Sequence, residues 1–451
     1  MKFLSAVLVA LVSTECYAFT VSSMKRPSMV ATSTSTSTRT SSSSSYLKSS
    51  GSAETEIEIE IETETPTANA QTQKNEARNY DLTPEFAGAY AKAEAGLSAA
   101  VAKQELLTPL LHFTKEYLAA NQASFQAGNE LASAPAAVGR ILEAIQLGIR
   151  HGTGDEKYLF GASHKALRGN PDNEDGNEFD FYHFGCNFFR PCVQVEKSIV
   201  LGQNNLDQAM EYLAKGENVV FLANHQSEAD PQVMSICFEK AGLAKQAADI
   251  VYVAGHKVTT DPLAIPFSMG RNLICIHSKK HIDAEPEMKP VKQRQNLAAM
   301  GGMLDLLKKG GCVLWVAPSG GRDRRDLETG KVPPAPFDTK TIDMFRLMGN
   351  KSKVKTHYFP LAMLTYDLCP PPDFIEAGVG EQRNVRFVPV GINCGEAIES
   401  QGGLDRRHEF CEIAQQTCLD DYEELVAALH EHIWTLHEHI WTWIWTNWNW
   451  M

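Results

Sequence analysis

A histidine and an aspartate five positions apart follow an apolar run near the middle of this 451-residue sequence. His225 and Asp230 come just after the letters VVFLA, and Pro231 favours the start of a helix. Positions five apart on one helix are rotated by about 140° and do not share a face. At a strand end and the first turn of a helix, however, the two side chains can meet. Asp230 would then hold one imidazole nitrogen and leave the other free as a base. The alternative is that His225 is a structural histidine and Asp230 a helix cap.

Basic residues follow a second apolar run of the sequence. Arg322 and Arg324 come after the turn Ser319-Gly320-Gly321. Glycines in such a turn let the backbone approach an anion, and the arginine side chains can bind one through two parallel hydrogen bonds. This segment is therefore a candidate anion-binding loop.

A further basic pair, Lys280 and His281, comes from the loop after another apolar run. If the two runs are neighbouring strands, both loops serve the same anion. Arg271 comes just ahead of the apolar run at 273–276 that leads to Lys280. It either joins the other basic residues at the anion or braces its loop. For each basic residue taken alone, the alternative is a solvated surface charge.

These loops need a scaffold, and the sequence beyond residue 178 predicts one. Short β-rich runs alternate with helical stretches, the runs lying at 219–223, 250–254, 273–276, 312–317, 358–364 and 385–390. Alternation of this kind predicts an α/β domain with a central mixed, largely parallel sheet, whose functional residues lie in loops at the strand ends. We place this larger domain at residues 178–428.

The region before it has helical signals. Thr83-Pro84-Glu85 combines a capping residue, proline at the first helical position and an acid in the first turn. Apolar residues at three-and-four spacing follow Pro135, from Val138 to Ile149, and predict an amphipathic helix. Residues 81–168 are therefore predicted to form a small helical bundle, separated from the α/β domain by the turn-rich stretch 169–177.

The overall charge and the cysteines limit the possible functions. The chain has 42 Lys+Arg and 55 Asp+Glu, a formal charge of −13, which argues against a protein that binds nucleic acid through spread positive charge. Its ten cysteines include no CxxC pair and no regular framework, so reduced and mostly buried thiols are expected. Beyond the N-terminus no run of 18 apolar residues predicts a membrane-spanning helix.

The first 80 residues have the composition of targeting segments. Residues 1–18 contain an apolar run and end in Cys16-Tyr17-Ala18, as a signal peptide would. Residues 19–53 are rich in Ser and Thr and contain bases but no acid, as in a transit peptide. Residues 54–80 are predicted to be a disordered linker. The two signals in series resemble the bipartite presequence of algae with secondary plastids and predict the plastid stroma; a secreted protein with a disordered leader is the alternative.

Residues 429–451 form a low-complexity tail rich in His and Trp. The letters LHEHIWT occur at 429–435 and again at 436–442, and six of the seven tryptophans lie between Trp434 and Trp450. We predict no metal site from its histidines, because a duplicated heptad looks like a recent extension or a gene-model error. Peripheral contact with a membrane is the alternative role, since Trp favours the headgroup region.

Four blocks, in order, resemble the soluble plastid glycerol-3-phosphate acyltransferases, a branch of the His-x4-Asp glycerolipid acyltransferases. The blocks are residues 221–231, 260–281, 316–324 and 359–362, and the resemblance covers most of residues 80–425. Upstream, Phe179-Asp180-Phe181-Tyr182 and Arg190-Pro191 also resemble this family.

This resemblance implies transfer of an acyl chain from an acyl thioester to the sn-1 hydroxyl of glycerol 3-phosphate, giving 1-acyl-sn-glycerol 3-phosphate. His225 would be the general base and Asp230 its partner, and the substrate phosphate would be bound by Lys280, His281, Arg322 and Arg324. The family uses no cofactor or metal, and its donor is acyl-acyl carrier protein or acyl-CoA. The chain has His256-Lys257 where the family pattern leads us to expect an Asp-Arg pair.

Three other functions fit parts of this pattern. A lysophosphatidate acyltransferase would use the same His-x4-Asp residues. A serine hydrolase would need a Gly-x-Ser-x-Gly frame, which Ser319 lacks. A non-catalytic lipid- or anion-binding module would bind ligand without turnover. The basic segment from Lys289 to Arg294 either receives an acidic carrier protein or is a solvated helix start.

Overall fold

The structure is a computed structural model that describes residues 80–101, 103–155, 157–169, 179–277, 282–283, 285–372, 382–400 and 406–448. The signal peptide and transit peptide predicted for residues 1–18 and 19–53 lie outside these ranges, as does the linker up to residue 79. The described residues from Asp81 onward belong to one compact unit.

In the described residues, eight strands form one mixed sheet in the order β1-β5-β4-β6-β3-β7-β8-β2. The five central strands are parallel to one another, and the edges carry the antiparallel pairs β1–β5 and β7–β8. The strand bounds are β1 Ser163–His164, β2 Ile199–Leu201, β3 Asn218–Ala223, β4 Val251–Gly255, β5 Asn272–Ile276, β6 Val313–Val316, β7 Thr356–Leu364 and β8 Gly391–Cys394. This confirms the predicted α/β fold with a mixed, largely parallel sheet.

Strand β3 lies at the centre of the sheet and is apolar along nearly its whole length because both of its faces are covered. Every residue of β3 is buried. Val219 and Phe221 face one hydrophobic core, and Val220 and Leu222 face the other. The parallel neighbours β6 and β7 therefore end at the same edge as β3, and the loop at 224–229 starts from that edge.

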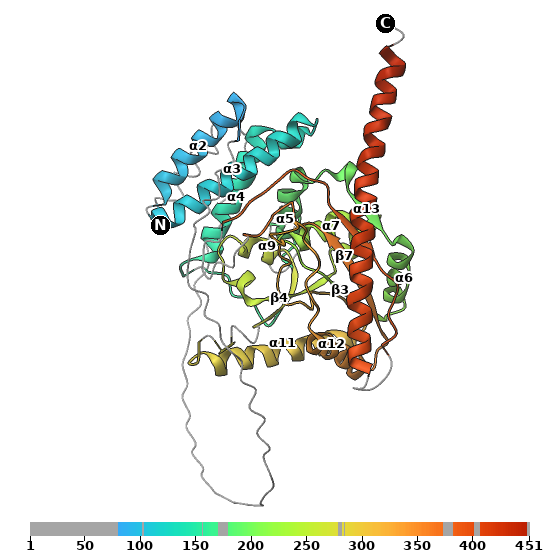
Figure 1. The fold of residues 1–451 in the computed structure, drawn as a ribbon. Helices are drawn as coiled ribbons and strands as arrows, with labels where there is room; N and C mark the ends of the chain where they lie inside the picture. Colours follow the sequence, from blue (N-terminus) through green and yellow to red (C-terminus); the bar gives the residue numbers. More distant parts are fainter. Residues whose placement is uncertain are drawn as a thin grey trace, which may run out of the picture. The chain divides into compact units, whose positions relative to one another are not determined.

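Helices on one face of the sheet include the N-terminal helices, which share a hydrophobic core with the sheet. In Figure 1 they lie together, coloured blue and cyan. The bounds are α2 Pro84–Ala100, α3 Gln104–Gln126, α4 Ala134–Gly152, α5 Phe181–Phe189, α6 Gln203–Ala214, α7 Asp230–Lys240, α8 Ala244–Ala247 and α9 Ile265–Met269. The helix start predicted at Pro84 and the helix predicted from Val138 to Ile149 are confirmed, the second beginning at Ala134, whereas the division into separate domains at residues 168 and 178 stays a prediction.

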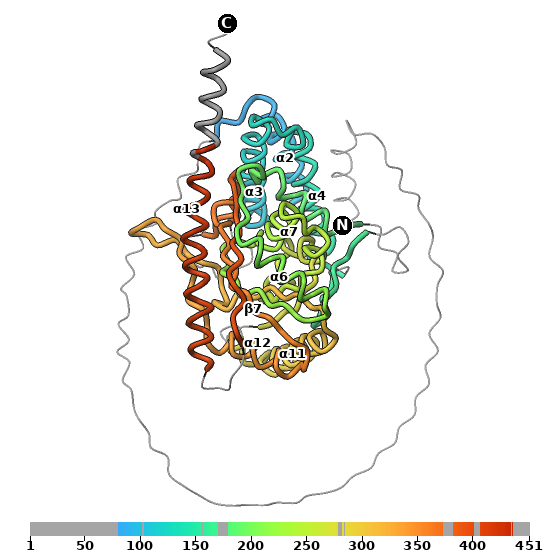
Figure 2. The backbone as a smooth tube through the Cα atoms, turned by 90° about the vertical axis from the view of Figure 1, so that its right-hand side faces the viewer, coloured from blue at the N-terminus to red at the C-terminus, as the bar shows by residue number. Residues whose placement is uncertain are grey.

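The other face is covered by α11 Lys289–Lys309 and α12 Thr339–Ser352, which lie below the sheet in Figure 1. A long helix, α13 Arg407–Trp448, runs beside β7 in both Figure 1 and Figure 2. Tyr422, Leu425 and Leu429 of α13 pack against the β7 and β2 edge. Helix α13 thus continues past residue 429, where the tail was predicted to begin.

Five of the six predicted strands are present within two residues of their predicted ends. The strand predicted at 385–390 is wrong, because this segment forms only one isolated bridge, at Val388, and the ladder starts at Gly391. Pro389 explains the shift, since proline has no N–H to donate to a ladder. The short strands β1 and β2 were not predicted, and β1 lies in the region expected to be helical throughout.

Candidate active site

His225 and Asp230 meet across the turn between β3 and α7. Nδ1 of His225 lies 2.7 Å from Oδ2 of Asp230. His225 follows the end of β3 by two residues, and Asp230 is the first residue of α7. The predicted contact between a strand-end histidine and a helix-start aspartate is confirmed.

The Asp230 carboxylate is fully buried, and hydrogen bonds offset the cost of that burial. Oδ2 also accepts a hydrogen bond from the backbone N–H of Gln226 at 2.9 Å. Oδ1 accepts from the backbone N–H of Ser227 at 3.1 Å and from the Thr365 hydroxyl at 2.6 Å. These hydrogen bonds fix the orientation of the carboxylate, so Oδ2 is held in place as an acceptor for the imidazole.

The other nitrogen of the His225 ring is left available. The ring is partly exposed, at 25%, and its edge packs against Trp315 with the centroids 5.7 Å apart. In the described part of the chain, Nε2 makes no hydrogen bond, whereas Nδ1 is bound to Asp230. The contact at Nδ1 therefore orients Nε2 away from Asp230, as a general base requires.

The two residues that flank His225 anchor its loop. Asn224 donates hydrogen bonds to Asp323 Oδ2 and to the backbone oxygen of Met363, and accepts one from the Met363 N–H. Gln226 accepts from the backbone N–H of Thr365, at 2.8 Å. Both side chains are fully buried, so the loop that carries His225 is bound to the end of β7 on both sides.

A backbone hydrogen bond brings the candidate anion-binding loop to the histidine. The N–H of Asp323 donates to the carbonyl oxygen of His225 at 2.6 Å. Asp323 lies between Arg322 and Arg324, which are both partly exposed. Arg324 donates from Nη1 to the carbonyl oxygen of Pro372 at 2.7 Å. The segment with the two arginines is thus paired directly with the turn that carries the catalytic candidate.

The Asp323 side chain is itself fully buried. It accepts hydrogen bonds from Asn224 at 2.9 Å and from the backbone N–H of Ala335 at 2.8 Å. Burial raises the pKa of Asp323 to about 6, although these hydrogen bonds and the nearby His225 oppose the shift. Asp323 therefore connects the histidine loop with the segment ahead of α12.

The turn Ser319-Gly320-Gly321 has the backbone that its glycines suggest. Gly320 has a φ of +70°, which an L side chain rarely adopts. A Cβ atom added at Gly320 or Gly321 would meet no heavy atom within 4 Å. The hydroxyl of Ser319 donates to the carbonyl oxygen of Gly321 at 3.0 Å. The turn is therefore open to a ligand, and Ser319 is not paired with a catalytic base.

Arg271 braces the fold instead of joining the arginine loop. It is buried and lies just before β5, at the amino edge of the parallel strands. Its guanidinium donates to Ser235 Oγ at 2.6 Å and Cys186 Sγ at 3.2 Å, and lies 4.7 Å from the Tyr182 ring centroid. The five residues of β5 separate it from the carboxyl edge by roughly 16 Å, so the bracing interpretation fits.

Lys280 and His281 lie outside the described residues. The chain reaches them from Ile276, the last residue of β5, at the carboxyl edge of the sheet. At this edge His256 stacks on His277 with the centroids 4.1 Å apart, and burial lowers the pKa of His256. The His256-Lys257 pair that departs from the family pattern therefore lies beside His277, the residue that follows β5.

One ion-pair cluster at the site was not predicted from the sequence. Arg383 binds Glu228 Oε1 at 2.6 Å and Asp261 Oδ2 at 2.8 Å. Glu228 belongs to the turn between His225 and Asp230, so the cluster connects that turn with two distant segments. Neither the spacing nor the residue types around Arg383 signal this contact, because its partners lie more than 100 positions away.

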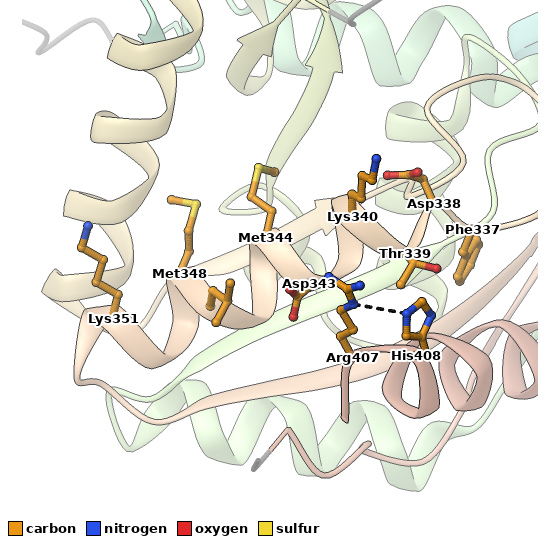
Figure 3. Close-up of a pocket in the computed structure, with 11 residues that line it drawn as sticks. Phe337, Asp338, Thr339, Lys340, Asp343, Met344, Met348, Lys351, Arg407 and His408 are labelled. Carbon is orange, nitrogen blue, oxygen red and sulfur yellow. Dashed lines mark hydrogen bonds between the residues drawn. The ribbon is translucent and has the colours of Figure 1, made fainter. Parts of the chain in front are cut away.

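A cavity of about 680 Å³ lies between α12 and the start of α13, and the predicted site residues are not among its lining. Figure 3 shows Met344 and Met348 on one face of α12, with Lys340 and Lys351 toward its two ends. Because this cavity does not include His225 or the arginine loop, it is separate from the candidate active site.

The basic segment at the start of α11 is partly neutralised. Lys289 pairs with Asp283 at 2.9 Å, and Lys292 pairs with Glu285 at 3.1 Å. These acids reduce the net positive charge that the segment offers to an acidic carrier protein.

Three general features concern the described residues as a whole. They contain no group of three or more His, Cys, Asp or Glu placed to bind a metal ion. No helix among them combines the length and the apolar character that crossing a bilayer requires. The nine described cysteines are all buried, as expected, and no disulfide joins them to one another.

Comparisons with known proteins agree with the geometry. Residues 205–366 match the family model described as Acyltransferase. The chain is 41% identical over 283 residues to the chloroplastic glycerol-3-phosphate acyltransferase ATS11 of Cucurbita moschata, covering 61% of each chain. It is 36% and 35% identical over 282 residues to the chloroplastic glycerol-3-phosphate acyltransferases of Pisum sativum and Arabidopsis thaliana, covering 61% of this chain and 60% of each relative.

These matches thus span about three-fifths of the curated relatives' own length. Among solved structures, the 1-acyl-sn-glycerophosphate acyltransferase PlsC of Thermotoga maritima is 19% identical with a TM-score of 0.34, covering 55% of this chain and 78% of that one. A likeness this distant supports no conclusion here.

Proposed function

We propose that this chain, whose residues 205–366 match the acyltransferase family model, transfers an acyl chain from an acyl thioester to the sn-1 hydroxyl of glycerol 3-phosphate. The product is 1-acyl-sn-glycerol 3-phosphate. The observation that carries the proposal is the contact of 2.7 Å between His225 Nδ1 and Asp230, which leaves Nε2 available in a turn whose backbone is hydrogen-bonded to the arginine loop. The names of the plant relatives support the choice of acceptor.

His225 acts as the general base in this reaction. Nε2 takes the proton from the sn-1 hydroxyl as its oxygen attacks the thioester carbonyl carbon, and Asp230 stabilises the imidazolium that forms. The C–S bond then breaks, and the departing thiolate receives the proton back from His225. The transfer is direct, because a thiolate leaves readily and both substrates are bound together.

Arg322 and Arg324 bind the phosphate of the acceptor and so orient its far hydroxyl toward His225. A guanidinium suits this task because its planar fork matches phosphate oxygens. Lys280 and His281 complete the phosphate site in our proposal, on the strength of the family resemblance. Ser319, Gly320 and Gly321 form the turn that gives the phosphate access to this loop.

We further propose that the donor is carried by acyl carrier protein in the plastid stroma, reached through the signal and transit peptides of residues 1–53. The chloroplastic relatives support the organelle. The start of α11 would contact the acidic carrier. Changing Lys289, Lys292 and Arg294 to Glu should then raise the KM for acyl-acyl carrier protein and leave the KM for acyl-CoA little changed. Equal KM values before and after the change would exclude this docking surface.

One assay tests the reaction itself. Purified protein is incubated with labelled glycerol 3-phosphate and hexadecanoyl thioesters of acyl carrier protein or coenzyme A. We expect 1-acyl-sn-glycerol 3-phosphate, and His225→Ala should lower kcat by about 10² to 10⁴-fold, the range for loss of a positioned general base. Acylation of only the monoacyl ester would identify a lysophosphatidate acyltransferase. Binding of glycerol 3-phosphate without turnover would identify a non-catalytic module.

A further inference from the structure

The cavity between α12 and the start of α13 has a largely apolar wall along α12. Its volume of about 680 Å³ lies within the usual range of small-molecule sites, about 300 to 1,000 Å³. Three residues of α12 contribute most of this wall, namely Met344, Leu347 and Met348. Leu347 is 44% exposed, so a ligand can reach the apolar wall. Methionine side chains adapt readily to a flexible apolar partner.

Positive charges flank this apolar wall along α12. Four lining residues recur at intervals of three or four positions: Lys340, Met344, Leu347 and Lys351. Residues at this spacing share one face of a helix. Lys351 follows Lys340 by 11 positions, which corresponds to about 16 Å along a helix axis. Figure 3 shows the two lysines toward opposite ends of α12, with the methionines between them. The face is therefore apolar in its middle and has a cation at each end.

The start of α13 adds a third cation to the cavity. Arg407 lines the cavity together with His408, and Figure 3 shows both toward the Lys340 end of α12. Nε of Arg407 donates a hydrogen bond to Nε2 of His408 at 3.2 Å. Its two Nη atoms make no hydrogen bond or ion pair with the part of the chain that the structure describes. This end of the cavity therefore offers a guanidinium and an ammonium group to an anion.

The two acids of the lining are already engaged. Asp343 accepts two hydrogen bonds from the buried Arg346, one from Nε at 3.1 Å and one from Nη2 at 2.7 Å. Asp338 caps α12, because its Oδ1 accepts from the backbone N–H of Thr341 at 2.7 Å. The three cations of the lining, in contrast, form no ion pair with any described residue. The cavity thus has an excess of positive charge, in a chain whose formal charge is −13.

We propose that this cavity binds a single-chain anionic lipid as a monomer. The chain lies along Met344, Leu347 and Met348, and the anionic head binds Arg407 and Lys340. An apolar wall bordered by unpaired cations fits a ligand that carries one apolar chain and one negative head. The walls come from two helices, α12 and α13, so the site encloses a monomer instead of resting on a flat membrane surface.

This site is a second one, separate from the reaction centre. Its lining contains neither His225 nor the arginine loop, and none of the sequence motifs lies in it. The lipid class includes 1-acyl-sn-glycerol 3-phosphate, and naming this compound as the natural ligand rests on the proposed function, because it is the product. The enzyme would then bind its own product at a place where no chemistry occurs.

The test uses the full-length protein and hexadecanoic acid with a photoreactive diazirine on its chain, below its micelle concentration. After irradiation, mass spectrometry of the digested protein quantifies the probe attached to α12, Thr339–Ser352. Probe bound elsewhere, including the active site, does not enter this measurement. We expect saturable labelling that unlabelled hexadecanoic acid and 1-hexadecanoyl-glycerol 3-phosphate suppress. Monohexadecanoylglycerol, which has the chain without the charge, and glycerol 3-phosphate, which has the charge without the chain, should not suppress it.

A charge reversal at neighbouring arginines tests the binding of the head. Arg407 lines the cavity, whereas Arg406 does not and pairs with Glu409 at 2.9 Å. Arg407→Glu should raise the probe concentration at half-saturation about tenfold or more, since it removes a hydrogen bond between charged groups. Arg406→Glu makes the same charge change outside the cavity and should alter this concentration less than about twofold.

A second matched pair tests the binding of the chain. Leu347 and Ile413 are almost equally exposed, at 44% and 43%, but only Leu347 lines the cavity. Leu347→Asp should weaken labelling of α12 about tenfold, because it removes apolar contact and adds a negative charge beside the chain. Ile413→Asp should leave labelling unchanged. Circular dichroism checks that all four variants fold.

Several outcomes would overturn the proposal. They are the absence of saturable labelling on α12, equal suppression by monohexadecanoylglycerol, and equal losses in the cavity variants and their controls. Binding to phosphatidylglycerol vesicles that depends on Arg407, without labelling by the monomeric probe, would also overturn it and identify a membrane-docking surface. The proposed function fails separately: labelling that depends on Arg407 and Leu347 in a protein that acylates nothing would contradict only the proposed function. Normal acylation without labelling of α12 would contradict only this site.

Discussion

The hydroxyl of Thr365 donates a hydrogen bond to Oδ1 of Asp230 over 2.6 Å, although the two residues are 135 positions apart. Thr365 follows the last residue of β7, so this bond fastens the carboxylate to the neighbouring strand. Because Oδ2 serves His225, the bond at Oδ1 fixes the orientation of the carboxylate and hence that of the imidazole.

Replacing Thr365 with Val removes this donor and preserves the shape of the side chain. A hydrogen bond to a buried charge contributes about 1.5 to 3 kcal/mol, so the free energy of unfolding should fall by that amount. We expect kcat to fall as well, but less than in His225→Ala. Urea denaturation and steady-state kinetics measure the two effects. Thr365→Ser, which keeps the donor, should recover most of both; a Val variant with wild-type kcat would show that this bond does not orient the site.

Asp323 should make folding stability depend on pH between about pH 4 and pH 6. Burial raises its pKa in the folded state to about 6, from an ordinary value near 3.8. Across this interval the folded protein keeps a proton that the unfolded chain releases. The contribution of Asp323 is therefore zero below the interval, falls by about 1.4 kcal/mol per pH unit as the pH rises through it, and stays constant above pH 6.

Asp323→Asn provides the comparison, because its side chain does not ionise. The difference in unfolding free energy between the wild type and this variant should fall from about pH 4 to pH 6 and then level off, as measured by denaturation at several pH values. Loss of the acceptor that faces Asn224 adds an offset that does not vary with pH. A difference that stays flat throughout, or one that rises with pH, would contradict the buried ionisation.

The central features of the site follow local rules and could be predicted from the sequence. His225 and Asp230 flank one turn, and the apolar letters before the turn together with Pro231 after it indicate a strand followed by a helix. The backbone of Gly320 could also be anticipated, because glycine adopts a positive φ at no steric cost and Gly320 has one. Strand β8 was misplaced because Pro389 ends a run whose apolar letters alone suggest a strand.

The supporting contacts could not be predicted, because they depend on which distant segments the fold brings together. Thr365, Asp323 and Arg383 each reach the histidine turn from a position about 100 or more residues away. Nothing in their local sequence distinguishes them from other polar residues. The polar residues Asn224 and Gln226 on either side of His225 were a usable signal, since polar side chains buried beside a strand end require partners.

Arg271 should matter for stability and not for phosphate binding. Lys at this position lacks the planar fork whose two Nη atoms reach Ser235 and Cys186 separately, so we expect Arg271→Lys to lower the free energy of unfolding by about 2 to 4 kcal/mol. The KM for glycerol 3-phosphate should change by less than about twofold, because Arg271 lies at the amino edge of the sheet.

Arg322→Lys is the counterpart and should raise the KM for glycerol 3-phosphate about tenfold or more by removing a guanidinium fork from the phosphate. A large KM effect in Arg271→Lys would restore it to the phosphate site.

Two glycines of α4 should respond in opposite directions to the same substitution. Both Gly139 and Gly148 lie inside the helix, where Ala is intrinsically favoured by up to about 1 kcal/mol. A Cβ atom at Gly139 would meet nothing within 4 Å, so Gly139→Ala should raise the free energy of unfolding.

At Gly148 the added atom would lie 2.7 Å from the carbonyl oxygen of Pro262, which is backbone and cannot rotate away. We therefore expect Gly148→Ala to lower the free energy of unfolding by about 1 to 3 kcal/mol, as in other overpacked sites, when both variants are compared by urea denaturation. Stabilisation by both substitutions would mean that α4 does not pack this closely on the 261–263 loop.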